Sequence, residues 1–345
     1  AQTVLEYKDV IEAELRTSLK SGFQLLALND FTGQGYAPVG ILDPFWESKG
    51  LITPEKFREF CAPTVALLRF PKRAYYCDET FEGKAEVYNY SPSILKSAKA
   101  KWWITDASGR VLKSGRLKTQ RIGNYGVFPL GTFQYNSVTA PQKLTIHLSV
   151  GDKVHNSWDI WVYPHHKDLM QTTPDVLYTT TYDAKAKQYL QEGKKVVLCP
   201  KPNKVKGRKS VFHNHFWNPI MVKWAPTTLG CLIHADQPMF ADFITEKHLD
   251  WQWWDILTNA KVIDMTDTPQ ELRPFIQVID SYETNQKLGI GFEARVNNGK
   301  LLVLAVDTRK DLDKRPATQQ LLKSIDQYVK SGQFAPRATV KEEFI

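Results

Sequence analysis

The first residues of the chain carry apolar side chains at every fourth position. These positions are Tyr7, Ile11, Leu15 and Leu19. The spacing predicts one helix over residues 4–19 with an apolar face, and Gly22 is expected to end it. The run 23–28 that follows is almost entirely apolar, as expected of a parallel strand buried on both faces.

A second helix is predicted from Pro54 toward Cys61. Thr53 is a favourable N-cap, Pro54 suits the first helical position, and Glu55 places an acid in the first turn. A helix, a buried strand and a further helix together indicate an α/β unit.

After Pro63 the pattern changes to short alternating segments separated by turns. Residues 84–90, 144–150 and 157–163 read as strands, and the turn 106–109 joins two more in a hairpin. Such a series is typical of an antiparallel sandwich, so residues 64–164 are expected to form an immunoglobulin-like module of about 100 residues.

Helical and strand patterns alternate again from residue 168. A strand over 176–180, a helix from Asp183 through Gln191 and a strand from Val196 form a short βαβ unit. A hairpin across Asn297-Asn298-Gly299 and a final helix follow. Residues 168–336 are therefore predicted to be an α/β domain similar to the class I amidotransferases, and residues 337–345 a tail.

Composition is that of a folded protein with several domains. The 345 residues are 42% hydrophobic and 24% charged, and no apolar run approaches the length of a membrane helix. The net charge of +8 does not predict nucleic-acid binding, because the only basic cluster, residues 201–209, reads as a solvated loop. No leader is recognised at the N-terminus, and a periplasmic or secreted location is expected rather than a cytoplasmic one.

Three stretches resemble family 2 glycoside hydrolases, the β-galactosidase-like and β-glucuronidase-like enzymes. They are residues 22–50, with the motifs GFQLLALNDF, GQG and GILDPFW, residues 229–255 with DWQWWD, and residues 273–280. The resemblance implies that residues 1–63 are the last βα unit of a (β/α)8 barrel. It also implies a parent enzyme that hydrolyses β-linked glycosides with retention.

The family's two catalytic glutamates lie on earlier barrel strands that this sequence does not contain. A retaining mechanism needs two carboxyl groups about 5–5.5 Å apart. We therefore expect no catalytic residue here, and a carbohydrate substrate bound only through the complete barrel, with the upstream barrel portion as partner. The alternative is a non-catalytic carbohydrate-binding or assembly module, and a homo-oligomer is possible.

The predicted substrate-binding residues follow the apolar run. At the C-terminal face of a barrel, Asn29 and Asp30 would hydrogen-bond sugar hydroxyls, and Phe31 and Trp46 would stack on a sugar ring. The alternative for Asn29 and Asp30 is that they only begin the loop.

Other chemistry-bearing residues are expected to be structural. The acids Glu12, Glu14, Glu47, Glu55 and Glu59 read as solvated. No metal site is predicted from His213, His215, His234 and His248, which lack supporting ligands, and no cofactor is predicted.

The cysteines and tryptophans are also expected to be structural. Cys199 is followed by Pro200, which is incompatible with a nucleophile elbow, so an inert thiol is predicted. The tryptophans of residues 217–254 resemble a carbohydrate platform, but burial is the expected fate.

Overall fold

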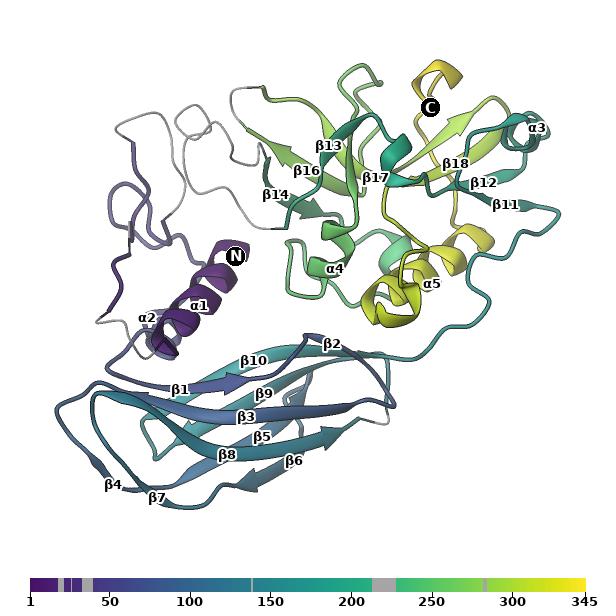
Figure 1. Ribbon diagram of the computed structural model, residues 1–345. Helices are drawn as coiled ribbons and strands as arrows, with labels where there is room; N and C mark the ends of the chain where they lie inside the picture. The colour runs from purple at the N-terminus through teal and green to yellow at the C-terminus, as the bar shows by residue number, and fades with distance from the viewer. Residues whose placement is uncertain (18–21, 26, 33–39, 138, 213–227, 282–283) are drawn as a thin grey trace. The chain divides into compact units, whose positions relative to one another are not determined.

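The computed structural model describes residues 1–17, 22–25, 27–32, 40–137, 139–212, 228–281 and 284–345. These residues are β-rich, with few helices (Figure 1). They divide into two compact units, residues 1–163 and the residues from Pro164 onward. Each unit has its own hydrophobic core.

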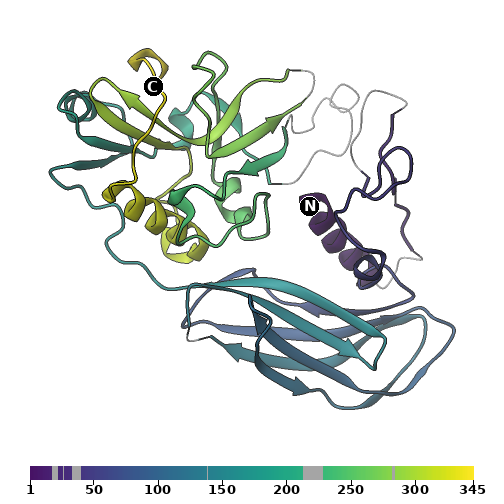
Figure 2. The ribbon, with the colours of Figure 1, turned by 180° about the vertical axis from the view of Figure 1, so that it is seen from behind.

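Unit 1 begins with helix α1 (Gln2–Leu15), which is inclined to the strands and brings its C-terminal end close to the sandwich in both views (Figures 1 and 2). Its buried face carries Ile11 and Leu15, as the periodicity predicts, and these side chains pack with Phe60, Val65 and Leu67. The described part of this apolar face is therefore covered by Phe60 and by strand residues of the same unit. Helix α2 (Pro54–Arg58) follows, and the Thr53 side chain caps it by accepting from Lys56 N.

The sandwich consists of two main layers, in which the strands pair antiparallel except that β2 runs parallel to β10. One sheet has the order β1-β3-β8 and the other β2-β10-β9-β5-β6, with β4 and β7 paired separately. The strands are β1 (Thr64–Arg69), β2 (Ala74–Tyr76), β3 (Thr80–Asn89), β4 (Leu95–Ala98), β5 (Ala100–Asp106), β6 (Val111–Arg116), β7 (Gln120–Ile122), β8 (Gly126–Asn136), β9 (Gln142–Val150) and β10 (Val154–Tyr163).

Alternation places one side of each long strand in the core between the layers. On β3 the alternate residues Phe81, Gly83, Ala85 and Val87 are buried, while Glu82, Lys84 and Glu86 between them are partly or fully exposed. The hairpin predicted around residues 106–109 is present, with Lys101 opposite Arg116. Gly109 adopts φ +82°, which suits glycine at this turn.

The strand predicted over residues 23–28 is wrong. The described residues of this stretch form no strand, and Phe23 is 38% exposed. Isolated bridges follow, from Asn29 to Leu42 and from Leu42 to Ser48. A parallel strand needs neighbours on both edges, and no barrel forms among the described residues to supply them.

Unit 2 is built on a mixed sheet of order β11-β12-β18-β17-β15-β13, with β16 pairing β17 and β14. The strands β11, β12 and β18 are parallel. The elements are β11 (Val176–Thr179), α3 (Ala184–Gln191), β12 (Lys195–Leu198), η1 (Pro202–Lys204), β13 (Gly207–Lys209), β14 (Thr228–Ile233), η2 (Pro238–Phe240), α4 (Trp253–Thr258), β15 (Lys261–Asp264), β16 (Ile276–Asp280), β17 (Leu288–Val296), β18 (Gly299–Leu304), η3 (Leu312–Lys314), α5 (Pro316–Lys330) and η4 (Glu342–Phe344).

The predicted βαβ unit and the last hairpin are both present in unit 2. Asp183 caps α3 by accepting from Ala186 N, and Gly193 follows the helix at φ +78°. The Ala186 and Leu190 side chains pack on the sheet with Leu198 and Phe292. Within the described ranges, no helix has the length and apolarity needed to cross a membrane.

Candidate functional site

The predicted substrate-binding residues lie in two different environments. The Asp30 carboxylate is 2% exposed and accepts from Gly40 N at 2.9 Å, and the Lys49 ammonium lies 2.6 Å from it. A Cβ on Gly40 would lie 2.2 Å from the Asn29 carbonyl carbon, so glycine allows this close approach. Asp30 therefore anchors a loop, and its predicted hydrogen bond to a sugar hydroxyl stays a prediction.

The aromatic residues of this predicted set are open to solvent. Phe31 is 40% exposed and Trp46 is 63% exposed. Trp46 lies in a turn held by Asp43, whose carboxylate accepts from the Phe45 and Glu47 amides. Its φ is +69°. Sugar stacking by Phe31 and Trp46, and hydrogen bonding by Asn29, stay predictions.

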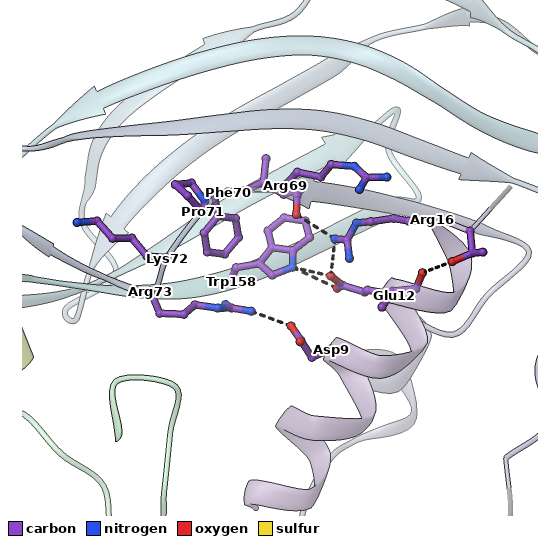
Figure 3. A pocket seen from close by; sticks show the side chains of 12 residues that line it. Asp9, Glu12, Arg16, Arg69, Phe70, Pro71, Lys72, Arg73 and Trp158 are labelled. Atoms are coloured by element: carbon purple, nitrogen blue, oxygen red, sulfur yellow. Dashed lines mark hydrogen bonds and ion pairs between the residues drawn. The ribbon is translucent and has the colours of Figure 1, made fainter. Parts of the chain in front are cut away.

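A cleft of about 530 Å³ lies beside α1 within unit 1 (Figure 3). Asp9, Glu12 and Arg16 line it from the helix, and Trp158 lines it from β10. The connection from β1 to β2 supplies the other side chains, which are Arg69, Phe70, Pro71, Lys72 and Arg73. The cleft therefore joins residues that are far apart in the sequence.

Glu12 forms the base of this cleft, contrary to its predicted place on a solvated face. It is 2% exposed, and its carboxylate accepts from Lys8 Nζ, from Arg16 at 3.0 Å and from the Trp158 indole at 2.9 Å. Asn156 donates at 2.8 Å. The signal in the sequence is the pair of cations one turn before and one turn after Glu12, at Lys8 and Arg16.

Electrostatics keeps this buried carboxyl ionised. Burial by itself raises the pKa of Glu12, but the Lys8 ammonium and the Arg16 guanidinium outweigh it and hold the pKa below its usual range. Burial lowers the pKa of Lys8, with Glu12 opposing that effect. A carboxylate held in this way is a structural anion and not a proton donor at neutral pH.

Three tyrosines form an aromatic surface at one end of the sandwich, here called the tyrosine platform. The Tyr88 and Tyr90 rings are stacked with centroids 4.5 Å apart, and Tyr125 meets Tyr90 edge-on at 6.1 Å. Tyr88 and Tyr90 are half-buried and Tyr125 is 63% exposed. The i, i+2 spacing puts Tyr88 and Tyr90 on the same side of the extended chain.

One buried amide fixes the loops that carry the tyrosine platform. Asn89 is fully buried and donates to Ser93 O at 3.0 Å and to Gly123 O at 2.7 Å. Its oxygen accepts from the hydroxyls of Thr64 and Ser91. Tyr125 adopts φ +57°, which is uncommon for a bulky residue and marks a position fixed by its surroundings.

A chain of hydrogen-bonding side chains runs across the outer face of the other sheet. His147 lies 3.2 Å from the Thr105 hydroxyl and 3.3 Å from His155, which in turn lies 2.9 Å from Glu59. Trp103 stacks on His147 at 4.8 Å. Burial, and then the neighbouring His155, lower the pKa of His147 to about 4.

The candidates in unit 2 are structural or lie outside the described residues. Burial raises the pKa of Cys199 to about 12, which agrees with an inert thiol. His213, His215, Trp217 and Trp224 fall outside the described ranges. In the described part of the chain, no three His, Cys, Asp or Glu side chains gather as metal ligands.

The tryptophans that the structure does describe do not form an open platform. Trp253 is fully buried, as expected, while Trp251 and Trp254 pack around Phe212. Trp254 remains 49% exposed. In the basic segment 201–209, Arg208 is bound to the buried Asp280 at 2.6 Å.

Two family models match parts of the chain. Residues 177–345 match the model described as Domain of unknown function (DUF8487), and residues 79–164 match Domain of unknown function (DUF8488). No curated protein matches.

Similarity to solved structures is weak. The CARDB domain of the PF1109 protein from Pyrococcus furiosus, solved with di-metal ions, is 17% identical, with 30% of this chain and 94% of that chain covered and a TM-score of 0.24. The sporulation control protein Spo0M from Bacillus subtilis is 12% identical, with 30% and 51% covered and a TM-score of 0.23. A β-glucuronidase from glycoside hydrolase family 2 is 10% identical, with 28% and 11% covered and a TM-score of 0.23.

These comparisons overturn the resemblance to family 2 glycoside hydrolases. The matching family models are domains of unknown function, and nothing specific to the C-terminal portion of those enzymes is found. The motifs of residues 22–50 are short and rich in loop-forming glycine, and their described part forms a bridged loop instead of a barrel strand. The glycosidase activity implied by that resemblance loses its support.

Proposed function

We propose that this chain is a non-catalytic carbohydrate-binding module and that the tyrosine platform of the sandwich is its binding surface. The observation that carries the proposal is the grouping of Tyr88, at the end of β3, with Tyr90 and Tyr125, on loops fixed by the buried Asn89. Aromatic rings offer a flat apolar face to the C–H bonds of a pyranose, and the phenol hydroxyl offers a hydrogen bond.

Preorganisation supports binding at this surface. Asn89 holds the chain at Ser93 and at Gly123, so the loop that carries Tyr125 is positioned before a ligand arrives. Tyrosine adds large contact area with few rotatable bonds, so little side-chain entropy is lost on binding. Ser91 and Asn124 lie on the same loops, where their side chains donate to Asn89 Oδ1 and to Pro92 O and help to hold the loops in place.

The ionisation state of Glu12 favours carbohydrate binding over hydrolysis of a glycosidic bond. Cleavage of a glycosidic bond needs a protonated carboxyl group near the leaving oxygen. The best-enclosed carboxyl beside a cleft, Glu12, is ionised and already accepts hydrogen bonds from neighbouring side chains.

The test is titration of the full chain with cellohexaose, xylohexaose and mannohexaose by calorimetry. Binding of at least one oligosaccharide is expected. Replacing Tyr125 by Ala removes a ring worth about 1–1.5 kcal/mol, or roughly five- to tenfold in affinity. Tyr125→Phe keeps the ring and should retain most of the affinity. Equal affinities of Tyr125→Ala and the unmodified chain would contradict the platform.

A second candidate function, self-assembly, is favoured by the turn 43–47. Phe45 is 83% exposed and its neighbour Trp46 is 63% exposed, and the Asp43 carboxylate fixes their backbone. Adjacent exposed aromatic residues are typical of interface anchors. Sedimentation of the chain over a concentration series, compared with a Phe45→Ser, Trp46→Ser double variant, tests this function. A monomer at all concentrations for both proteins would contradict it.

A further inference from the structure

The cleft beside α1 has an excess of positive charge. Arg16, Arg69, Lys72 and Arg73 line it against the carboxylates of Asp9 and Glu12, which leaves four positive and two negative charges on the lining (Figure 3). Glu12 is directed into the contact between α1 and the sandwich, where Trp158 and Asn156 donate to it. These hydrogen bonds stabilise the Glu12 carboxylate from beneath the cleft.

The cations on the rim are held by partners that water also reaches. Arg73 donates to Asp9, which is 49% exposed, and Lys72 bonds Glu79, which is 36% exposed. Arg69 is itself 50% exposed and pairs with Glu86. The Lys72–Glu79 and Arg69–Glu86 pairs are reached by solvent and are therefore weak, so an incoming oxyanion replaces one of these carboxylates at small cost.

Arg16 offers a donor that the described residues leave without an acceptor. Its terminal nitrogen donates to Glu12 and to Leu68 O at 2.9 Å, while Arg16 Nε is buried with no partner. A buried donor without an acceptor costs free energy, and a bound ligand or water would remove that cost. The Arg73 guanidinium lies 4.7 Å from the Phe70 ring centroid, so an aromatic face helps to position it.

We infer that this cleft binds a sugar acid through its carboxylate, with Arg73 and Lys72 as the main cationic contacts. The volume of about 530 Å³ lies within the range of small-ligand sites. A guanidinium matches a planar carboxylate with two parallel hydrogen bonds. The inference adds a second site to the proposed carbohydrate-binding function and uses none of the tyrosine platform.

The experiment titrates the full chain with D-galacturonate and with D-galactose, which differ by a carboxylate in place of a hydroxymethyl group. Galacturonate is expected to bind, at least tenfold more tightly than galactose, with an affinity that falls as salt rises. Inorganic phosphate is a third probe and is expected to compete weakly. Equal affinity for the two sugars, or binding of phosphate alone, would overturn the inference.

Three variants separate the site from general charge effects. Lys72→Gln should weaken galacturonate binding at least threefold, and Asp9→Asn should strengthen it, because the competing carboxylate on Arg73 is removed. Arg110→Gln removes an exposed cation that pairs with Asp106 on the β5–β6 hairpin, and should leave the affinity unchanged. Weaker binding in Arg110→Gln to the same degree as in Lys72→Gln would contradict a local site.

The two proposed binding sites can be tested separately, because each variant is expected to affect only one of them. Tyr125→Ala should leave galacturonate affinity unchanged, and Lys72→Gln should leave oligosaccharide affinity at the tyrosine platform unchanged. Thermal unfolding of each variant confirms that it is folded. Loss of galacturonate binding in a folded Tyr125→Ala protein would refute the separate cleft site.

Discussion

Glu12 is a carboxylate withdrawn from water that receives hydrogen bonds from both α1 and the sandwich. Lys8 and Arg16 reach it from its own helix, while Asn156 and Trp158 reach it from β10. Lys8 also lies 4.7 Å from the Trp158 ring centroid and donates to Asn156. Each group therefore satisfies another that would be costly to bury alone.

Glu12→Gln is expected to destabilise unit 1 by about 3–5 kcal/mol, because it leaves the half-buried Lys8 ammonium without its buried counter-ion. Chemical denaturation followed by tryptophan fluorescence measures the change. Glu55→Gln, on the exposed face of α2, is the control and should change stability little. A Glu12→Gln protein as stable as the control would show that the network contributes nothing.

His147 makes unit 1 sensitive to mild acid. Its pKa of about 4 in the folded chain lies below the value of about 6.5 for an unfolded histidine. Between these values the unfolded chain binds a proton that the folded chain does not, so stability falls as the pH drops from 6.5 toward 4. Denaturation at pH 7 and pH 5 should show this loss, and His147→Gln should reduce it. An equal loss in both proteins would assign the effect to other groups.

Residue patterns predict which positions face a core better than they predict which polar groups a tertiary contact will bury. The Asn89 and Glu12 networks join residues that are 34 and more than 140 positions apart, and no local spacing indicates such contacts. The position of Tyr125 beside Tyr90 was likewise not predicted, although Gly123, Asn124 and Gly126 around it are turn-forming residues.

At the scale of elements, the sequence pattern predicted the hairpin around residues 106–109 and α3 close to their observed bounds, and it predicted that α1 and α5 exist without fixing where they end. It predicted a strand over residues 23–28 wrongly, because a short apolar run does not say whether a neighbouring strand exists to pair with it. Helices and hairpins depend on local spacing, whereas a parallel strand depends on partners far along the chain.

Two substitutions on helix α1 test how much the stability of unit 1 depends on the apolar face of this helix. Ile11 is 3% exposed and its neighbour Val10 is 60% exposed. Ile11→Ala should cost about 2–5 kcal/mol in unit 1, because it leaves a cavity against Phe60 and Leu67. Val10→Ala should change stability little, since that side chain faces solvent. Similar losses for the two variants in urea denaturation would contradict the packing of this face.

At the scale of the whole molecule, the chain holds two cores of different construction. Alternating strands from two layers fill the core of the sandwich. The core of unit 2 lies between a mixed sheet, helix α3 and the segment around Val340. The family models also match separate regions, residues 79–164 and 177–345, which fits an arrangement of modules.

Two cores predict two separable unfolding transitions in the full chain. Leu321 is fully buried on α5 of unit 2, and Leu321→Ala removes about 2–5 kcal/mol from that unit alone. In a unit of this size the loss lowers the midpoint by on the order of 5–15 °C. Ile11→Ala should lower the other transition and leave this one in place, because independent cores do not share the lost contacts. Differential scanning calorimetry measures the unfolding transitions of the two variants and of the unmodified chain. Comparing the three traces assigns each transition to a unit even where the transitions overlap. A single transition that both substitutions shift equally would show that the two cores unfold as one.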